Sequence, residues 1–84
     1  MTVESILAER GAIYGDYAEV AATSQKIKAV LRCGRSWDLM TDRERESLDM
    51  IANKLARIAN GIPHRDNWVD LSGYAELIAK MMED

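Results

Sequence analysis

Two carboxylates in the last third of the chain have the spacing that is most suggestive of a binding site. Asp66 and Asp70 are four residues apart, so on a helix they share one face. On the same helical wheel, Asp70 falls inside an apolar arc, beside Tyr74 and Leu77. A carboxylate that points toward an apolar seam is costly unless a cation, a metal ion or hydrogen-bond donors meet it. The pattern predicts a polar site between two helices, and Asp66 is also suited to cap the helix that it begins.

The preceding helical stretch offers polar groups for the same seam. Lys54 and Arg57 are candidate cationic partners for Asp70, while Asn53 and Asp49 lie on a flank beside small alanines. One interpretation is a solvated flank, or a hydrogen-bond network that fixes the register of the helices. The other is a Mg²⁺ site, because hard cations prefer oxygen ligands and phosphate oxygens can complete the shell. In that case the expected metal ligands are Asp49 and Asp70.

Apolar periodicity predicts four helices and no strands. The expected helices cover about residues 3–12, 17–32, 42–60 and 66–82. Thr41 and Glu44 form a capping box at the start of the third helix. Short connections between long helices favour a compact four-helix bundle. The fold class is therefore all-α, with residues 1–84 as a single domain.

Glycines lie in a turn, at a helix end and inside a helix of the predicted fold. Gly15 lies in a turn before Asp16, which is placed to cap the second helix. Gly61 is expected to end the third helix in a left-handed conformation, and Pro63 prevents its continuation. Gly73 lies inside the fourth helix, where we expect it to permit the close approach of another helix or a ligand.

Composition narrows the possible partners and the compartment. An 84-residue chain with no Phe, two Trp and many alanines has a light core, so we expect a homo-oligomer, most simply a dimer. The net charge of −3 disfavours nonspecific nucleic-acid binding, which needs a basic surface. The single Cys33 suits a reducing cytoplasm, and no apolar run reaches the length of a membrane span.

Three motifs resemble a family of small phage and prophage proteins that has no settled function. They are Arg10 with Tyr14-Gly15-Asp16, the string N-K-L-A-R-I at residues 53–58, and the string D-N-W-V-D-L-S-G-Y-A at residues 66–75. The resemblance covers about residues 6–77 and implies a phage accessory protein in the cytoplasm of a bacterial host.

At greater distance the chain is similar to nucleotide-modification-associated domains and to MazG-like all-α nucleotide pyrophosphohydrolases. The MazG-like enzymes hold magnesium with a Glu-x-x-Glu pair on one helix and a Glu-x-x-Asp pair on a later one. This chain has neither pair in the expected place: Glu46 and Asp49 are three apart, and Asp66 and Asp70 are four apart. Asn53 stands where related domains place an acid before the lysine. Fewer acids imply weaker metal binding and less support for hydrolysis.

Two functions of different classes follow. In the first, a pocket between the third and fourth helices binds a nucleotide or nucleotide-like ligand, with or without Mg²⁺, and sequesters or hydrolyses it. Cations would meet phosphate, Tyr14 would cover the base, and Asp49 and Asp70 would hold the ion or a sugar hydroxyl. The expected ligand-binding residues are Arg10, Tyr14, Asn53, Lys54, Arg57, Asp66, Asp70 and Tyr74. In the second, the chain is a protein-interaction module that inhibits or redirects a host factor and has no small-molecule ligand.

Overall fold

The computed structural model describes residues 2–82, and within them it contains four α-helices and no strand. The helices are α1 (Val3–Tyr14), α2 (Tyr17–Arg32), α3 (Asp42–Asn60) and α4 (Arg65–Ala79), with a short 3₁₀ helix, η1 (Trp37–Leu39), between α2 and α3. The all-α prediction is confirmed. None of the helices in this part of the chain combines the length and apolar character needed to cross a membrane.

Capping boxes fix the starts of two helices. At α3, the Thr41 hydroxyl accepts a hydrogen bond from the Glu44 N–H at 3.2 Å, and the Glu44 carboxylate accepts one from the Thr41 N–H at 3.0 Å. This confirms the predicted start of α3. At α1, Thr2 and Ser5 exchange the same pair of hydrogen bonds, and the Ser5 hydroxyl accepts the bond that the Glu44 carboxylate accepts in α3.

Two other helix starts differ from expectation. Asp16 occupies the cap position of α2 but makes no side-chain hydrogen bond to it. At α4, the cap position belongs to His64, so the prediction that Asp66 caps this helix is wrong. Asp66 lies two residues beyond the cap position, and its carboxylate lies 3.6 Å from the His64 Nε2 instead. The last helix also ends at Ala79, earlier than predicted.

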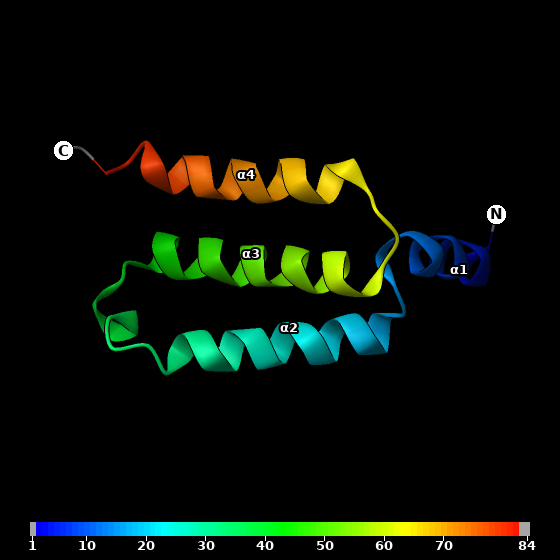
Figure 1. The fold of residues 1–84 in the computed structure, drawn as a ribbon, viewed down its shortest axis with the longest axis horizontal. Coiled ribbons are helices and arrows are strands. Elements are labelled where there is room, and N and C mark those ends of the chain that lie inside the picture. Colours follow the sequence, from blue (N-terminus) through cyan, green and yellow to red (C-terminus); the bar gives the residue numbers. More distant parts are fainter. Residues whose placement is uncertain (1, 83–84) are drawn as a thin grey trace.

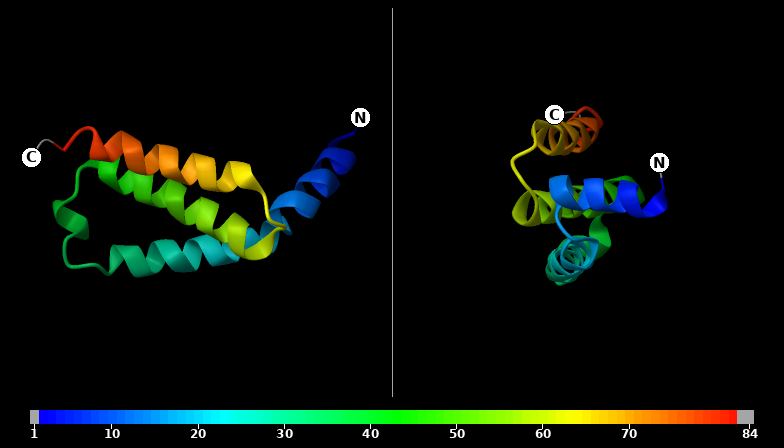
Figure 2. Two further views of the ribbon diagram at one scale, coloured as in Figure 1. Left: turned by 45° about the horizontal axis from the view of Figure 1, so that its top comes forward. Right: turned by 90° about the vertical axis from the view of Figure 1, so that its right-hand side faces the viewer.

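Helices α2, α3 and α4 form a single antiparallel layer with α3 in the middle (Figure 1). Helix α1 leaves one end of this layer at a steep angle (Figure 2). The radius of gyration is 14.6 Å, against about 12 Å for a compact chain of this length, and the molecule measures 47 × 25 × 21 Å. The four helices are as predicted, but the expected compactness is wrong. In a single layer only the central helix has a neighbour on each side.

The interior is correspondingly small. Its buried apolar residues are Val20 of α2 and Ala52 and Ala56 of α3, and these alanines let the neighbouring helices approach closely. Helix α1 contributes no buried residue. The accessible surface is 6329 Å², whereas a compact protein of this mass exposes roughly 5,000 Å². Much apolar surface therefore remains uncovered.

Two glycines let the ends of α1 and α3 cross in direct contact. Gly15 has φ +91°, and a Cβ there would lie 2.5 Å from the Asn60 carbonyl oxygen. A Cβ on Gly61 would collide with the Ile13 carbonyl oxygen, which also accepts a hydrogen bond from the Ile62 N–H at 3.1 Å. Gly61 itself has φ −106°, so the predicted left-handed conformation is wrong. It is close backbone approach that requires glycine at this position.

Gly73 has the opposite environment from the one expected. A Cβ added there meets no atom within 4 Å, so the predicted close approach is wrong within the chain. We expect Gly73→Ala to raise the free energy of unfolding by up to about 1 kcal/mol, because alanine favours the helix and restricts the unfolded chain. Urea denaturation followed by circular dichroism measures this change. A loss of stability would instead show that a second molecule approaches the α4 backbone here.

Candidate functional site

Four side chains from three segments gather at the corner where α1 ends, α3 ends and α4 begins. The Cζ atoms of Arg57 and Arg10 lie 4.9 and 5.7 Å from the centroid of the Tyr14 ring. The His64 ring meets the Tyr14 ring edge-on, at 5.5 Å between centroids and 83° between planes. We call Arg10, Tyr14, Arg57 and His64 the Tyr14 cluster.

Local sequence and the glycine crossing together build this cluster. Arg10 precedes Tyr14 by four residues in α1, which places both on one face of that helix. Arg57 lies one turn before Gly61, so the contact between Gly61 and the end of α1 carries Arg57 to Tyr14. Pro63 and His64 then follow directly into α4. The pairing of Arg10, Tyr14 and Arg57, which the sequence only proposed, is present in the fold.

Within the described part of the chain, the two guanidinium groups of the cluster carry positive charge that no carboxylate matches. Among residues 2–82, neither Arg10 nor Arg57 forms an ion pair with a carboxylate. Each gains about 0.5–1 kcal/mol from its contact with the aromatic face. Stacking leaves the N–H groups at the edge of a guanidinium available, and these form a fork that matches a phosphate or carboxylate. The cluster is therefore suited to bind an anion.

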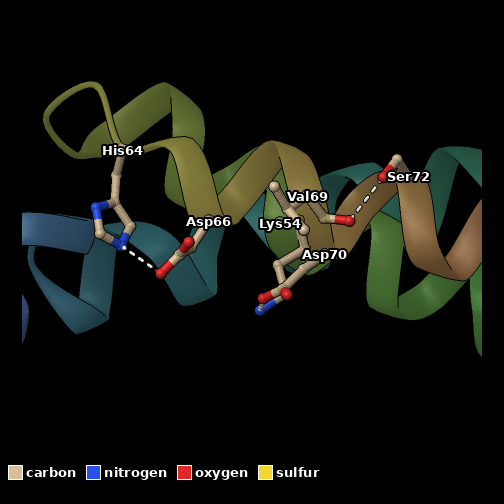
Figure 3. Close-up of polar contacts among 6 residues, drawn as sticks. All are labelled: Lys54, His64, Asp66, Val69, Asp70 and Ser72. Atoms are coloured by element: carbon tan, nitrogen blue, oxygen red, sulfur yellow. Dashed lines mark hydrogen bonds and ion pairs between the residues drawn. The ribbon is translucent and has the colours of Figure 1, made fainter.

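A second polar pair lies one turn into α4. The Lys54 Nζ is 3.0 Å from the Asp70 Oδ2, which identifies Lys54 as the cation that Asp70 requires. The Lys54 side chain is only 9% exposed, while that of Asp70 is 50% exposed. This pair and the pair of His64 with Asp66 follow the same side of the start of α4 (Figure 3). Asp70 is thus half exposed to solvent, one helical turn beyond the Asp66 that pairs with His64.

The two expected metal ligands, Asp49 and Asp70, form ion pairs at different helix–helix interfaces. Asp49 Oδ1 lies 3.7 Å from an Arg32 guanidinium nitrogen of α2, whereas Asp70 is paired with Lys54 across the seam to α4. Asp49 and Lys54 are five residues apart, which separates them by about 140° around the axis of α3. The two ion pairs therefore lie on different sides of this helix. Residues 2–82 contain no group of three or more Asp, Glu, His or Cys side chains that could hold a metal ion.

The remaining candidates lie outside the Tyr14 cluster. Asn53 is half-buried on α3 and makes no side-chain hydrogen bond to another described residue. Tyr74 lines open grooves between the first half of α3 and the end of α4, at the opposite end of the layer. It is the only candidate residue among their lining, which is mostly apolar.

Sequence reasoning gave too little weight to two residues. A histidine in a connection directly after a proline, as His64 is, is expected to be a surface residue, yet its ring contacts Tyr14. Asn67 is 2% exposed, and its buried Nδ2 has no hydrogen-bond acceptor among the described residues. A signal for Asn67 existed, because it continues the apolar arc through Leu71 and Tyr74 at helical spacing.

Comparison with known proteins finds one family. Searches of curated proteins and of solved structures give no match. Residues 2–82, nearly the whole chain and including every residue of the Tyr14 cluster, match the family described as a domain of unknown function, DUF6378. The chain belongs to this DUF6378 family.

Proposed function

We propose that the Tyr14 cluster binds the phosphate of a nucleotide or nucleotide-like ligand. The observation that carries this proposal is that Arg10 and Arg57, from two different helices, converge on Tyr14 without a carboxylate partner among the described residues. Convergent arginines bind phosphate through charge-assisted, bidentate hydrogen bonds. The distant resemblance to nucleotide-acting all-α domains favours a nucleotide over other phosphate compounds.

The neighbouring carboxylates suggest how the rest of the ligand is held. Asp70 is half exposed beside Lys54, so its free oxygen is available to accept a hydrogen bond from a sugar hydroxyl. Where Mg²⁺ accompanies the ligand, Asp70 is better placed than Asp49 to share it with phosphate, because Asp49 lies toward α2. With so few acids converging, we propose sequestration of the ligand rather than hydrolysis.

Ligand-dependent stabilisation tests the proposal. We expect one or more nucleoside mono-, di- or triphosphates, with or without Mg²⁺, to stabilise the protein by about 2.7 kcal/mol at a hundredfold excess over Kd. Arg57→Ala and Arg10→Ala should each weaken that binding by about 10- to 100-fold, because each removes a charged hydrogen-bond donor worth about 1.5–3 kcal/mol. Thermal shift and isothermal titration calorimetry measure both effects.

Arg35→Ala is the matched control, because Arg35 is exposed on the connection after α2 and makes no ion pair with a described residue. It should bind like the wild type. If no nucleotide stabilises the protein, or if Arg35→Ala weakens binding as much as Arg57→Ala, the Tyr14 cluster is not the phosphate site.

We further propose that the chain is a phage accessory protein that acts as a homo-oligomer in the cytoplasm of its bacterial host. The motif resemblance supports the phage origin, and the uncovered apolar surface supports self-association. A second candidate function is a protein-interaction module directed at a host factor. Exposed Trp68 and Val69 on α4 favour it, and an absence of any nucleotide response would make it the better explanation.

A further inference from the structure

We propose that two copies of the chain exchange their first helices: α1 of each copy packs into the groove between α3 and α4 at the far end of the other. This proposal rests on the homo-oligomer proposed above and specifies the surfaces, the symmetry and the contact. It does not depend on the proposed ligand.

The first half of this interface is the start of helix α1, a helix that contributes no buried residue to its own chain. Its apolar residues Val3, Ile6 and Leu7 share one face and are all exposed. An isolated helix of 12 residues is marginal in water, and most helices gain their stability from packing an apolar face. Helix α1 projects away from the layer, which leaves this face available to another molecule (Figure 2).

The second half is the open groove between the first half of α3 and the end of α4. It has a volume of about 410 Å³, and its apolar lining is Met50, Tyr74, Leu77, Ile78 and Met81. Leu77 and Met81 remain more than half exposed. Asp42, Arg43 and Glu46 also line the groove, so its polar edge carries charges of both signs.

The positions of the two halves select a twofold dimer. Helix α1 leaves one end of the long axis, and the groove lies at the other end, where α3 starts and α4 finishes (Figure 1). A twofold axis perpendicular to the long axis therefore brings each α1 to the groove of the other copy. Both contacts form at once and the assembly closes, as in most homodimers.

The uncovered area also matches a second copy. The accessible surface exceeds that of a compact monomer by about 1,300 Å². A stable protein–protein interface covers about 800 Å² on each partner, so the excess is sufficient for one such interface. We call the start of α1, with its exposed Val3, Ile6 and Leu7, the arm. Because the arm and the groove are both on this chain, a second copy can fill the groove and cover the arm without any other partner.

Size-exclusion chromatography with light scattering tests this arrangement, in reducing buffer because Cys33 is exposed. We expect the wild type at micromolar concentration to have twice the 9.4 kDa chain mass. Leu7→Glu on the arm and Leu77→Lys in the groove should each give the monomer mass. Both side chains are exposed within one chain, so circular dichroism should show that most of the wild-type helix content is retained. Val30→Lys, an equally apolar and 72% exposed position on α2, is the control and should remain dimeric.

Mixing the two monomeric variants tests the exchange itself. A dimer of Leu7→Glu with Leu77→Lys keeps one intact arm in one intact groove, and its other contact places Glu and Lys together. The mixture should therefore recover the dimer mass that neither variant shows alone. A wild type at 9.4 kDa would overturn both this arrangement and the homo-oligomer. A dimer that resists both substitutions, that Val30→Lys disrupts, or whose disrupted variants do not recover on mixing would overturn the arm exchange alone.

Discussion

Gly15→Ala should lower the free energy of unfolding by about 2–5 kcal/mol, the largest effect expected from any single substitution in this chain. Two causes act together. A φ of +91° is strained for alanine, and the new Cβ would lie 2.5 Å from the backbone of Asn60. Gly61→Ala should cost less, about 1–3 kcal/mol, because its φ suits alanine and the only cause is the collision of the new Cβ with the backbone of Ile13 and Tyr14. Urea denaturation followed by circular dichroism measures both.

Gly11→Ala is the matched control, since Gly11 lies in α1 with no atom within 4 Å of an added Cβ. It should be neutral or stabilising by up to about 1 kcal/mol. If Gly15→Ala were as stable as Gly11→Ala, the ends of α1 and α3 would not cross as described. The Tyr14 cluster would then lose the contact that brings Arg57 to Arg10.

Asp70→Ala should lower the free energy of unfolding by about 1–3 kcal/mol. Removing one partner of a fully buried ion pair costs about 3–5 kcal/mol, and the smaller figure applies because Asp70 is half exposed. Lys54 would be left almost buried without its counter-charge. For a domain of this size each kcal/mol shifts the melting temperature by about 4–8 °C, so calorimetry detects the change readily.

Two further variants distinguish the loss of the counter-charge of Lys54 from a general effect of removing a carboxylate from α4. Adding Lys54→Met to Asp70→Ala should recover most of the lost stability, because a buried apolar side chain needs no counter-charge. Asp66→Ala removes a carboxylate one turn earlier on α4 that is 74% exposed, and should change stability by less than about 0.5 kcal/mol. An Asp70→Ala variant as stable as the wild type would contradict the structural pairing. It would instead indicate that the carboxylate serves a ligand.

The four helices of this protein could be predicted from its amino-acid sequence. The bounds of α2 and the capping box that starts α3 could be read from the chain, because helical period and end caps depend on residues within one or two turns. The same local reasoning identified Lys54 as a candidate partner for Asp70, since both lie on the faces that adjoining helices present to each other. Local reasoning failed at the start of α4, where it placed the cap at Asp66, two residues after the actual cap at His64.

The arrangement of the helices, and the polar groups that this arrangement brings together, could not be predicted from the sequence. Glycine spacing could not reveal that Gly15 and Gly61 touch each other's helix while Gly73 faces open space, because each outcome depends on a segment distant in sequence. That crossing joins Arg10, Tyr14, Arg57 and His64, and the layer arrangement sends Asp49 and Asp70 to opposite sides of α3. Local hydrogen bonds and apolar periodicity determine where each helix begins and ends. Contacts between backbone segments distant in sequence determine how the helices are arranged, and this arrangement brings the residues of the candidate site together.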